Sequence, residues 1–251
     1  MSKVLLITGG ASGIGAETAR RAARRGYKVA INYRSRDAQA MGVAADIAAT
    51  DGEAIAIPAD MAHEGEIVRM FAEVERVFGP VTHLVNSAGI GARMRVDEYD
   101  AAALTRLFSV NVIGLMLCCR EAAKRMSTRH GGSGGAIVNV SSMASTIGGR
   151  SGSSAYAGSK GAVDSFTKGF AREVAAEGIR VNSIRPGMVL SEMTENRLKD
   201  AAFRQSIEAS IPMRRVGTTG EIADAVLYLL SDEAAFITGA MLDAAGGGYI
   251  I

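Results

Sequence analysis

The sequence predicts an α/β protein with a parallel sheet and helices on both faces, formed as one domain over residues 1–251. Apolar runs of strand length alternate with helical patterns along the whole chain. The first of these runs leads directly through a glycine-rich turn into a helix. No linker, internal repeat or low-complexity tract interrupts the pattern, and 251 residues suit a single domain of this class.

The composition is that of an ordinary globular protein, with 48% hydrophobic and 22% charged residues. The net charge is +2 and the basic residues are scattered, so no basic stripe for nucleic acid is present. The apolar start, Val4–Ile7, is too short for a signal peptide or a membrane span. Cys118 and Cys119 are adjacent in an apolar run and make poor disulfide partners, so we expect a reducing cytoplasm.

The first strand, Lys3–Thr8, is followed by the turn Thr8–Gly15, which reads TGGASGIG, and by a helix over Ala16–Arg25. Strand, glycine turn and helix in this order are typical of dinucleotide binding. Glycines let the backbone turn tightly and approach a pyrophosphate, which binds at the positive end of the following helix. A plain glycine-rich loop is the alternative, and the flanking strand and helix favour the cofactor.

The second strand, Lys28–Tyr33, ends where the adenosine ribose of a dinucleotide would lie. NAD-dependent enzymes commonly place an acid there to accept a hydrogen bond from the 2′-hydroxyl. This chain has Tyr33, Arg34 and Ser35 instead, and an arginine beside a hydroxyl suits a 2′-phosphate. We therefore expect NADP(H) rather than NAD(H). A solvated Arg34 is the alternative, and Ser12 is not basic, so we expect the preference to be modest.

The next part of the chain continues the alternation. We expect helices over Asp37–Thr50 and His63–Phe78, and strands over Glu53–Ala59 and Val81–Val85. Asp60 and Met61 follow the third strand, and Asn86, Ser87, Ala88 and Gly89 follow the fourth. An acid at the position of Asp60 can accept a hydrogen bond from an adenine amino group, or cap the next helix.

One long helix is predicted over Ala101–Met126, with Asn111 in its middle. Asparagine is a poor interior helix residue because its amide competes for backbone hydrogen bonds. Asn111 is therefore either a functional residue or a satisfied buried amide. The fifth strand, Ala136–Val140, ends at Ser141 and Ser142. Ligands of open parallel sheets bind at such strand ends, although paired serines also make turns.

Tyr156 and Lys160 lie four residues apart in a helix that continues to about Ala176. This spacing places both side chains on one helix face. A neighbouring ammonium lowers the pKa of a phenol, which is otherwise about 10. The pair is therefore a candidate proton donor and acceptor for a carbonyl or an alcohol, although the spacing also arises by chance.

The C-terminal part completes the alternation. We expect a strand at Ile179–Ile184, a helix at Thr219–Ser231 and a last strand at Ala240–Ala244. After the turn at Pro186 and Gly187, the segment Met188–Arg215 lacks strong periodicity, and we expect a mobile flap with short helices there.

Taken in order, seven motifs resemble those of the short-chain dehydrogenase/reductase family over nearly the whole chain. They are TGGASGIG, NSAG, the helix turn Asn111–Gly114, NVSS, YAGSK, RVNSIRPG and ITGAMLDAAGG. Each motif is weak alone, but together in one order they are specific. The resemblance implies a single-domain Rossmann fold, a doubly wound parallel sheet of about seven strands with the nucleotide at the switch point of the strand order.

The resemblance also implies catalytic roles for four residues. Tyr156 is expected to be the general acid/base, and Lys160 to lower its pKa and hold the nicotinamide ribose. Ser142, the second serine after the fifth strand, is expected to polarise the substrate oxygen, and Asn111 to hold a water in a proton relay behind the lysine. The implied activity is hydride transfer between NADP(H) and a small alcohol or carbonyl, without a metal ion.

The cofactor-binding residues that the motifs and the resemblance indicate follow the strand ends. They are Gly9, Ser12, Gly13, Ile14, Gly15, Tyr33, Arg34, Ser35, Asp60, Met61, Asn86, Ala88, Gly89, Tyr156, Lys160, Pro186, Gly187, Val189 and Ser191. Val189 is expected to contact the carboxamide through its backbone. Two features depart from the family: Ser87 replaces a second asparagine, which puts local rigidity in doubt, and the loop Met143–Ser154 is slightly long, which indicates a distinctive pocket.

The narrower function stays open. The resemblance covers 3-oxoacyl-carrier-protein reductases and sugar dehydrogenases of the glucose-1-dehydrogenase type. Arg129 and Arg172 match positions where the former dock their acidic carrier, although solvated helix-end charges explain them as well. A non-catalytic NADP(H)-binding regulator is the alternative from another class, disfavoured because all four catalytic residues are present.

We also expect a cytoplasmic homotetramer without nucleic-acid or membrane partners. The helices over Ala101–Met126 and Ser154–Ala176 carry more apolar surface than one sheet face can cover. The resemblance implies that they pair across two-fold axes, with the tail Phe236–Ile251 packed on another subunit.

Overall fold

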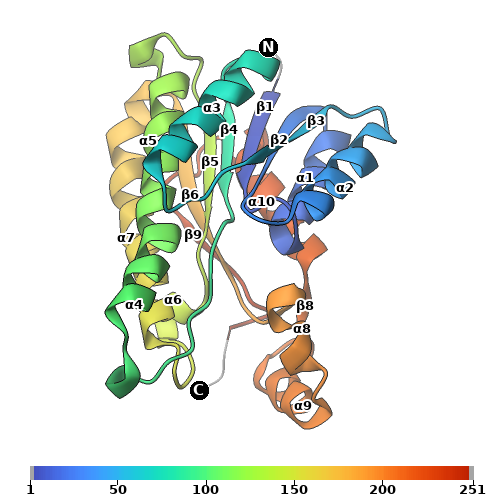
Figure 1. The fold of residues 1–251 in the computed structure, drawn as a ribbon, viewed down its shortest axis with the longest axis vertical. Helices are drawn as coiled ribbons and strands as arrows, with labels where there is room; N and C mark the ends of the chain where they lie inside the picture. The colour runs from blue at the N-terminus through green and yellow to red at the C-terminus, as the bar shows by residue number, and fades with distance from the viewer. Residues whose placement is uncertain (1–2, 249–251) are drawn as a thin grey trace.

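The computed structural model describes residues 3–248 and contains a seven-stranded sheet with helices on both sides (Figure 1). The strand order is β3-β2-β1-β4-β5-β6-β9, and neighbouring strands are parallel. The chain therefore winds outward in both directions from β1 and β4, which form the switch point. This confirms the predicted doubly wound fold. Of the domain predicted over 1–251, residues 1–2 and 249–251 lie outside the described residues.

The strands of this sheet follow the predicted alternation. They are β1 (Lys3–Thr8), β2 (Tyr27–Tyr33), β3 (Ala54–Pro58), β4 (His83–Asn86), β5 (Gly135–Val140), β6 (Ile179–Pro186) and β9 (Met241–Ala244). The helices between them are α1 (Gly13–Arg24), α2 (Asp37–Ala48), α3 (Glu64–Phe78), α4 (Ala101–Phe108), α5 (Leu115–Met126), α6 (Ala144–Ile147), α7 (Ser154–Val174) and α10 (Thr219–Leu230). Predicted and observed bounds differ by a few residues at several ends, as helix and strand ends generally do.

Each face of the sheet has its own core. Helices α3, α5 and α7 cover one face, and α1, α2 and α10 cover the other, on the left and right of Figure 1. Residues of β1 alternate between the two: Val4 and Leu6 pack in the first core, and Leu5 and Ile7 in the second. Because both faces are buried, the strand is a continuous apolar run rather than an alternating one.

The long predicted helix is present but is not one regular α-helix. Between α4 and α5, residues Ser109–Gly114 form a π-helical segment that contains Asn111. Helix and neighbouring loop approach closely there, since a Cβ on Gly114 would lie 2.1 Å from the Met61 carbonyl oxygen. The prediction of a uniform helix was wrong at this point, because apolar periodicity does not distinguish one extra residue in a turn.

The helical stretch Ala101–Met126 is long and apolar enough to cross a membrane by length and composition, with a mean hydropathy of 1.8. A core helix of a globular domain passes the same test, so one such helix is weak support for a span. In this fold, Leu115, Cys118 and Ala122 of the stretch pack into the first core.

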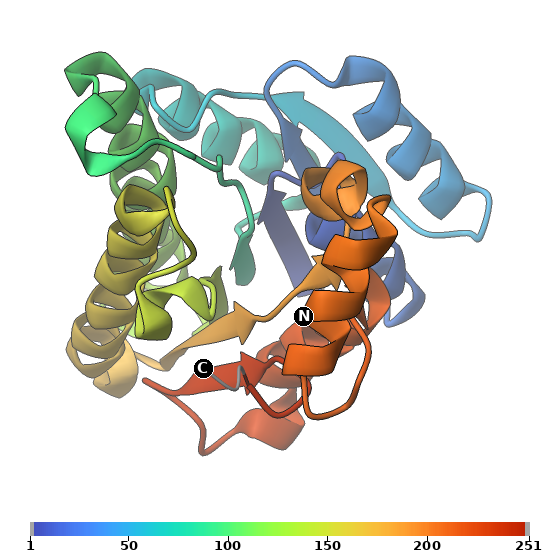
Figure 2. The same ribbon diagram turned by 90° about the horizontal axis from the view of Figure 1, so that it is seen from below.

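The segment Met188–Arg215, predicted as a flap with short helices, contains β7 (Val189–Leu190), α8 (Glu192–Leu198) and α9 (Ala201–Ser210). Strand β7 pairs with β8 (Gly217–Thr218) in a second, two-stranded sheet that the sequence did not predict. Leu198, Ile207, Ile211 and Val216 form a small hydrophobic core beneath this part of the chain, separate from the two main cores. Helices α8 and α9, orange in Figure 2, lie at the carboxyl end of the main sheet.

Candidate active site

The predicted site residues follow the carboxyl ends of neighbouring strands. The turn after β1, the loop after β4, the segment after β5 and the turn after β6 all follow the carboxyl ends of the parallel strands, the end of the sheet that faces the viewer in Figure 2. Strand pairing fixes this arrangement, since Thr8 is in register with Asn86, and Asn86 with Asn139. The sheet therefore brings together motifs that are far apart in the sequence.

The glycine turn after β1 requires glycine at two positions. Gly9 has a φ of +66°, and a Cβ on it would lie 2.8 Å from the Ala88 Cα. A Cβ on Gly15 would lie 2.4 Å from the Gly9 carbonyl oxygen. Side chains at either position would push the turn away from the loop after β4 or from α1. Ile14, the residue before Gly15, packs against the second core.

The start of α1 is suited to an anion. The helix begins at Gly13 rather than at the predicted Ala16, so the last glycines of the motif belong to its first turn. Ser12 is the N-cap residue but makes no side-chain capping bond, and the first turn contains no acidic residue. The N–H groups of this turn and the positive end of the helix dipole are therefore available for a pyrophosphate.

The residues after β2 include a cation that the sequence analysis did not name. Tyr33 is buried in the second core, whereas Arg34 and Ser35 are exposed. Arg36 donates to the Ser12 hydroxyl at 2.9 Å and forms an ion pair with Glu192, the first residue of α8. Arg36 thus connects the glycine turn to the segment after β6. Its signal in the sequence was the Arg-Ser-Arg spacing at the strand end.

Asp60 and Met61 lie after β3. The Asp60 carboxylate accepts hydrogen bonds from the Ala62 N–H at 2.9 Å and from Arg106 of α4 at 2.8 Å. Burial raises the Asp60 pKa, but these hydrogen bonds and the charges of Arg106 and His63 outweigh it and lower the pKa overall. The N-cap of α3 is His63, so the alternative of Asp60 as the helix cap was wrong. The Met61 side chain is buried in the first core.

Lys160 and Tyr156 form the helix-face pair that the sequence predicted. The Lys160 ammonium nitrogen lies 5.8 Å from the centroid of the Tyr156 ring. Lys160 is fully buried and donates a hydrogen bond to the Val140 carbonyl oxygen at 2.8 Å, at the end of β5. Burial lowers the pKa of this ammonium to about 8, and the charge of Asp164 partly opposes the shift. Tyr156 is half-buried.

Asn111 holds the loop after β4. Its amide oxygen accepts from the Ile90 N–H at 2.8 Å, and its amide nitrogen donates to the Ile90 carbonyl at 3.0 Å and to the Ser159 hydroxyl at 3.2 Å. A Cβ on Gly89 would lie 3.5 Å from the Asn111 amide oxygen and 3.6 Å from the Lys160 ammonium nitrogen. Asn111 and Lys160 therefore converge on Gly89. The Asn111 side chain is satisfied, and π-helical segments often occur at functional sites.

The two serines after β5 have different surroundings. Ser141 is buried, and its hydroxyl donates to the Lys160 carbonyl at 3.2 Å. Ser142 is partly exposed, and its hydroxyl oxygen accepts from the Ala144 N–H at 3.1 Å. That bond leaves the hydroxyl proton of Ser142 available to a substrate oxygen, whereas Ser141 already donates its proton to the protein. The longer loop that follows contains α6.

The loop after β4 is braced from two sides. The Asn86 amide nitrogen donates to Asn139 at 2.9 Å and to the Cys119 sulfur at 3.3 Å, so the Asn86 side chain points into the core. Any cofactor contact of Asn86 must therefore use its backbone. The Thr8 hydroxyl accepts from the N–H groups of Ser87 and Ala88, both at 3.1 Å. These bonds hold the backbone of the loop after β4, whose rigidity was in doubt because Ser87 stands where the family has a second asparagine.

The turn after β6 is closed by backbone contacts. The Gly187 N–H donates to the Ala244 carbonyl at 3.0 Å, and a Cβ on Gly187 would lie 2.9 Å from the Ala245 Cα. Pro186, the last residue of β6, accepts from the Met143 N–H at 3.0 Å. Val189 and Ser191 then lead into α8, where the Ser191 hydroxyl and Thr194 form a capping box.

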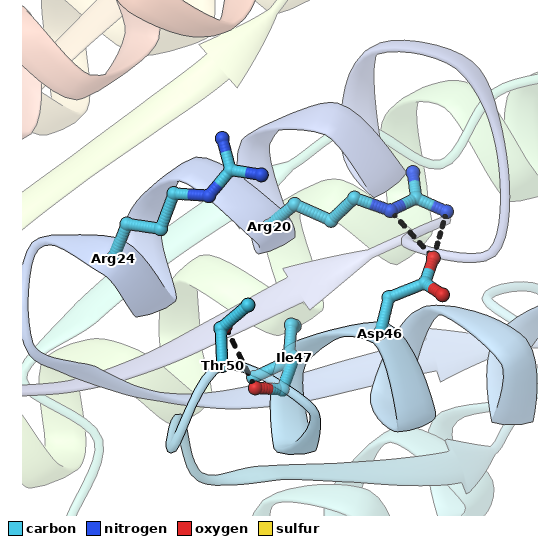
Figure 3. A pocket seen from close by; sticks show the side chains of 5 residues that line it. All are labelled: Arg20, Arg24, Asp46, Ile47 and Thr50. Carbon is cyan, nitrogen blue, oxygen red and sulfur yellow. Dashed lines mark hydrogen bonds and ion pairs between the residues drawn. The ribbon is translucent and has the colours of Figure 1, made fainter.

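A separate surface pocket lies between α1 and α2 (Figure 3). It has a volume of about 180 Å³ and is lined by Arg20, Arg24, Asp46, Ile47 and Thr50. An ion pair of 2.9 Å between Arg20 and Asp46 crosses it. None of the predicted site residues lines this pocket. Among the described residues, no group of three or more His, Cys, Asp or Glu side chains could hold a metal ion.

A comparison with known protein families matches residues 9–249 to the family model described as enoyl-(acyl carrier protein) reductase. Among curated proteins, the chain is 44% identical over 245 residues to the uncharacterized oxidoreductase YgfF of Escherichia coli K12, covering 97% of this chain and 99% of that protein. It is 36% identical to the 3-oxoacyl-[acyl-carrier-protein] reductase FabG of Staphylococcus epidermidis, covering 100% of both chains.

The solved structures agree with this family. A short-chain dehydrogenase/reductase from Serratia marcescens superposes with a TM-score of 0.91 at 33% identity, covering 98% of this chain and 97% of that chain. A short-chain type dehydrogenase/reductase from Mycobacterium ulcerans superposes with a TM-score of 0.91 at 31% identity, covering 98% and 90% of the two chains.

Proposed function

The chain belongs to the short-chain dehydrogenase/reductase family of oxidoreductases, and we propose that it uses NADP(H) to interconvert a small alcohol and its carbonyl form. The observation that carries this proposal is the buried Lys160 ammonium 5.8 Å from the Tyr156 ring. A cation kept in the interior beside a phenol is what proton transfer by that phenol needs. Ser142 follows the neighbouring strand end, with its hydroxyl proton available.

The residues present fit a dinucleotide. Glycine is required sterically at Gly9 and Gly15, and the first turn of α1 offers N–H groups without a competing acid. Arg34 and Arg36 after β2 favour the 2′-phosphate of NADP(H) over the 2′-hydroxyl of NAD(H). We assign the remaining cofactor contacts to the backbone after β3, β4 and β6.

The proposed mechanism divides the reaction among four side chains. Nicotinamide, when bound, supplies or accepts the hydride. Tyr156 gives a proton to the substrate oxygen in reduction and removes it in oxidation. Ser142 donates a hydrogen bond to that oxygen and stabilises the charge that develops on it. Lys160 favours the tyrosinate. Asn111 positions the loop beside it, and we assign to it the holding of a water in a proton relay behind Lys160.

Two narrower functions remain within this class. The match to a 3-oxoacyl-carrier-protein reductase favours an acyl thioester substrate, and Arg129 and Arg172 are exposed, as carrier docking requires. A sugar alcohol is the other possibility. A non-catalytic regulator is less compatible with the chain, because Tyr156 and Lys160 are both present. We place the protein in the cytoplasm, without a membrane or nucleic-acid partner.

The test of the proposed function is the variant Tyr156→Phe, which removes only the transferable proton. We expect this variant to bind NADPH as the parent does and to lose nearly all turnover on a panel of ketones, sugars and acyl thioesters. Fluorescence titration measures NADPH binding, and the change in NADPH absorbance measures turnover. A Phe variant that retains more than about a tenth of the parent rate would show that another group transfers the proton.

A further inference from the structure

Three arginines follow three different strands at the carboxyl end of the sheet. Arg93 lies in the loop after β4, Arg150 in the loop after β5 and Arg197 on α8, after β6. These are the same strand ends that carry Gly89, Ser142 and Val189. All three arginines are exposed. The cluster therefore lies at the same end of the sheet as the proposed catalytic residues.

Two of the side chains contact one aromatic ring, and the third lies in a loop hydrogen-bonded to the loop of Arg150. The guanidinium carbon of Arg197 lies 4.6 Å from the centroid of the Phe203 ring on α9, and that of Arg150 lies 5.7 Å from it. The Met94 N–H donates to the Gly152 carbonyl at 2.8 Å, and a Cβ on Gly152 would lie 3.2 Å from the Arg93 Cγ. The loops of Arg93 and Arg150 are thus held together.

The positive charges of Arg93 and Arg150 act on Arg197. Burial lowers the pKa of the Arg197 guanidinium, and the positive charges of Arg93 and Arg150 lower it further. Within residues 3–248, no carboxylate forms an ion pair with any of the three, and their guanidinium groups make no hydrogen bond to the protein. Neighbouring arginines differ, since Arg95 pairs with Asp97 at 3.0 Å and Arg204 with Glu208 at 2.9 Å.

We propose that Arg93, Arg150 and Arg197 bind an anionic group of the substrate, a carboxylate or a phosphate, while the carbonyl or alcohol carbon lies at Tyr156. Three planar cations that repel one another and lack acidic partners are stabilised when one anion binds between them. The Phe203 ring orients two of them by contact with its face. The proposal rests on the proposed function, because it names the substrate class of that same site.

A small anion fits this cluster better than an extended acidic surface does. Arg150 and Arg197 contact the same ring, and the charge of Arg93 acts on Arg197, so the three cations focus positive potential at one place instead of along a helix. Arg129 and Arg172 are the positions considered for a carrier protein. Arg129 follows the C-terminal end of α5 and Arg172 lies in the last turn of α7, so neither is part of the cluster. The anion is therefore assigned to the substrate molecule itself.

The first test compares pairs of substrates in which one member carries the anionic group and the other, of the same carbon skeleton, is neutral. The pairs are acetoacetate with methyl acetoacetate, and glucose 6-phosphate with glucose, which distinguish a carboxylate from a phosphate. We expect kcat/KM for the anion of one pair to exceed that for its neutral partner by about tenfold or more. Arg150→Gln and Arg197→Gln should each remove about tenfold from the anion only, and the control Arg95→Gln should change neither.

The second test does not depend on turnover. Calorimetric titration with succinate and with inorganic phosphate compares the parent with the combined variant Arg93→Gln, Arg150→Gln, Arg197→Gln. The combined variant keeps Arg34 and Arg36, so phosphate bound at the coenzyme position is the same in both proteins. We expect the variant to bind at least one of the two anions about tenfold more weakly.

Two results would overturn the inference: equal anion binding by the parent and the combined variant, or higher kcat/KM for the neutral member of both pairs. The proposed function fails separately. A protein that binds succinate or phosphate through these arginines but reduces no carbonyl and oxidises no alcohol with either coenzyme has the anion site and a different activity.

Discussion

Lys160 shows how the proposed chemistry conflicts with stability at a single residue. The side chain is buried, and it donates a hydrogen bond to a neutral carbonyl, that of Val140. A buried cation without a carboxylate in contact is costly, which is why its pKa is lowered to about 8. A shift of this size from 10.5 corresponds to roughly 3 kcal/mol, at 1.36 kcal/mol per pKa unit.

This conflict predicts a pH dependence of folding stability. Above its unfolded pKa of 10.5, Lys160 is neutral in both states and its burial has no charge cost. As the pH falls toward about 8, the unfolded chain binds a proton that the folded chain does not, so stability falls. In Lys160→Met this contribution is absent. Urea unfolding of both proteins between pH 7 and 10.5, without coenzyme, should show the parent gaining roughly 3 kcal/mol over the variant. Parallel profiles would mean that Lys160 is solvated.

We expect coenzyme choice to be decided at the residues after β2. A charge-assisted hydrogen bond is worth about 1.5–3 kcal/mol, so Arg34 alone predicts roughly tenfold to hundredfold preference for NADP(H). The absence of a basic residue at Ser12 suggested a modest preference. Arg36 donates to the Ser12 hydroxyl and adds a second cation, which its ion pair with Glu192 partly neutralises. We therefore expect a preference within this range.

The variant Tyr33→Asp with Arg34→Leu should reverse the choice, because it adds repulsion and removes attraction. Arg36→Leu alone should lower the NADP(H) preference by about tenfold, whereas the control Arg24→Leu, on the far end of α1, should not. The measurement is kcat/KM with both coenzymes, supported by dissociation constants from NADPH and NADH fluorescence. A parent that favours NAD(H) contradicts both assignments.

At the scale of elements, the sequence predicted secondary structure best where burial produces a simple pattern of apolar residues. Strand β1 is apolar on both faces, so its existence and its position before the glycine turn could be predicted. The segment Ser109–Gly114 could not, because a π-helical turn has the same apolar composition as an α-helical one. Strand β7 has two residues and pairs with a distant partner, and such a pairing leaves no local pattern.

The same limit applies to the site. Tyr156 and Lys160 could be predicted as a pair because helix spacing is local. The contacts of Arg36 with Ser12 and Glu192 join three segments that only the folded chain brings together. The convergence of arginines on Phe203 depends on loops, whose conformation is set by tertiary contacts and glycines with positive φ, as at Gly152.

The segment from Leu190 to Arg215 should close over bound coenzyme and substrate. Its small core of Leu198, Ile207 and Ile211 is separate from the two main cores, so local opening exposes little apolar surface. The Arg36–Glu192 ion pair links it to the residues after β2. Amide hydrogen exchange should show low protection of this segment without ligand and higher protection with NADP(H). Equal protection in both states would argue against a lid.

At the scale of the whole molecule, apolar side chains remain on the helices of the first face. Ile113, on the segment that joins α4 to α5, is 52% exposed, and Phe108, the last residue of α4, is 36% exposed. Phe166 and Phe170 of α7 stack at 5.4 Å, and Phe166 is only partly buried. Exposed apolar side chains on two adjacent helices are typical of a subunit interface.

We therefore predict a homotetramer with D₂ symmetry, in which these helices pair across two-fold axes. Ile113→Glu places a charge in the predicted interface and should yield smaller species by light scattering at micromolar concentration. Met41→Glu is the matched control: Met41 is 62% exposed on α2, on the opposite face, and the variant should remain tetrameric.

The tail is predicted to form a second contact between subunits, since Phe236 is fully exposed in the single chain, although residues 249–251 lie outside the described part. A monomeric parent would contradict the predicted tetramer, because Ile113 and Phe108 would then remain exposed to water instead of being buried between subunits.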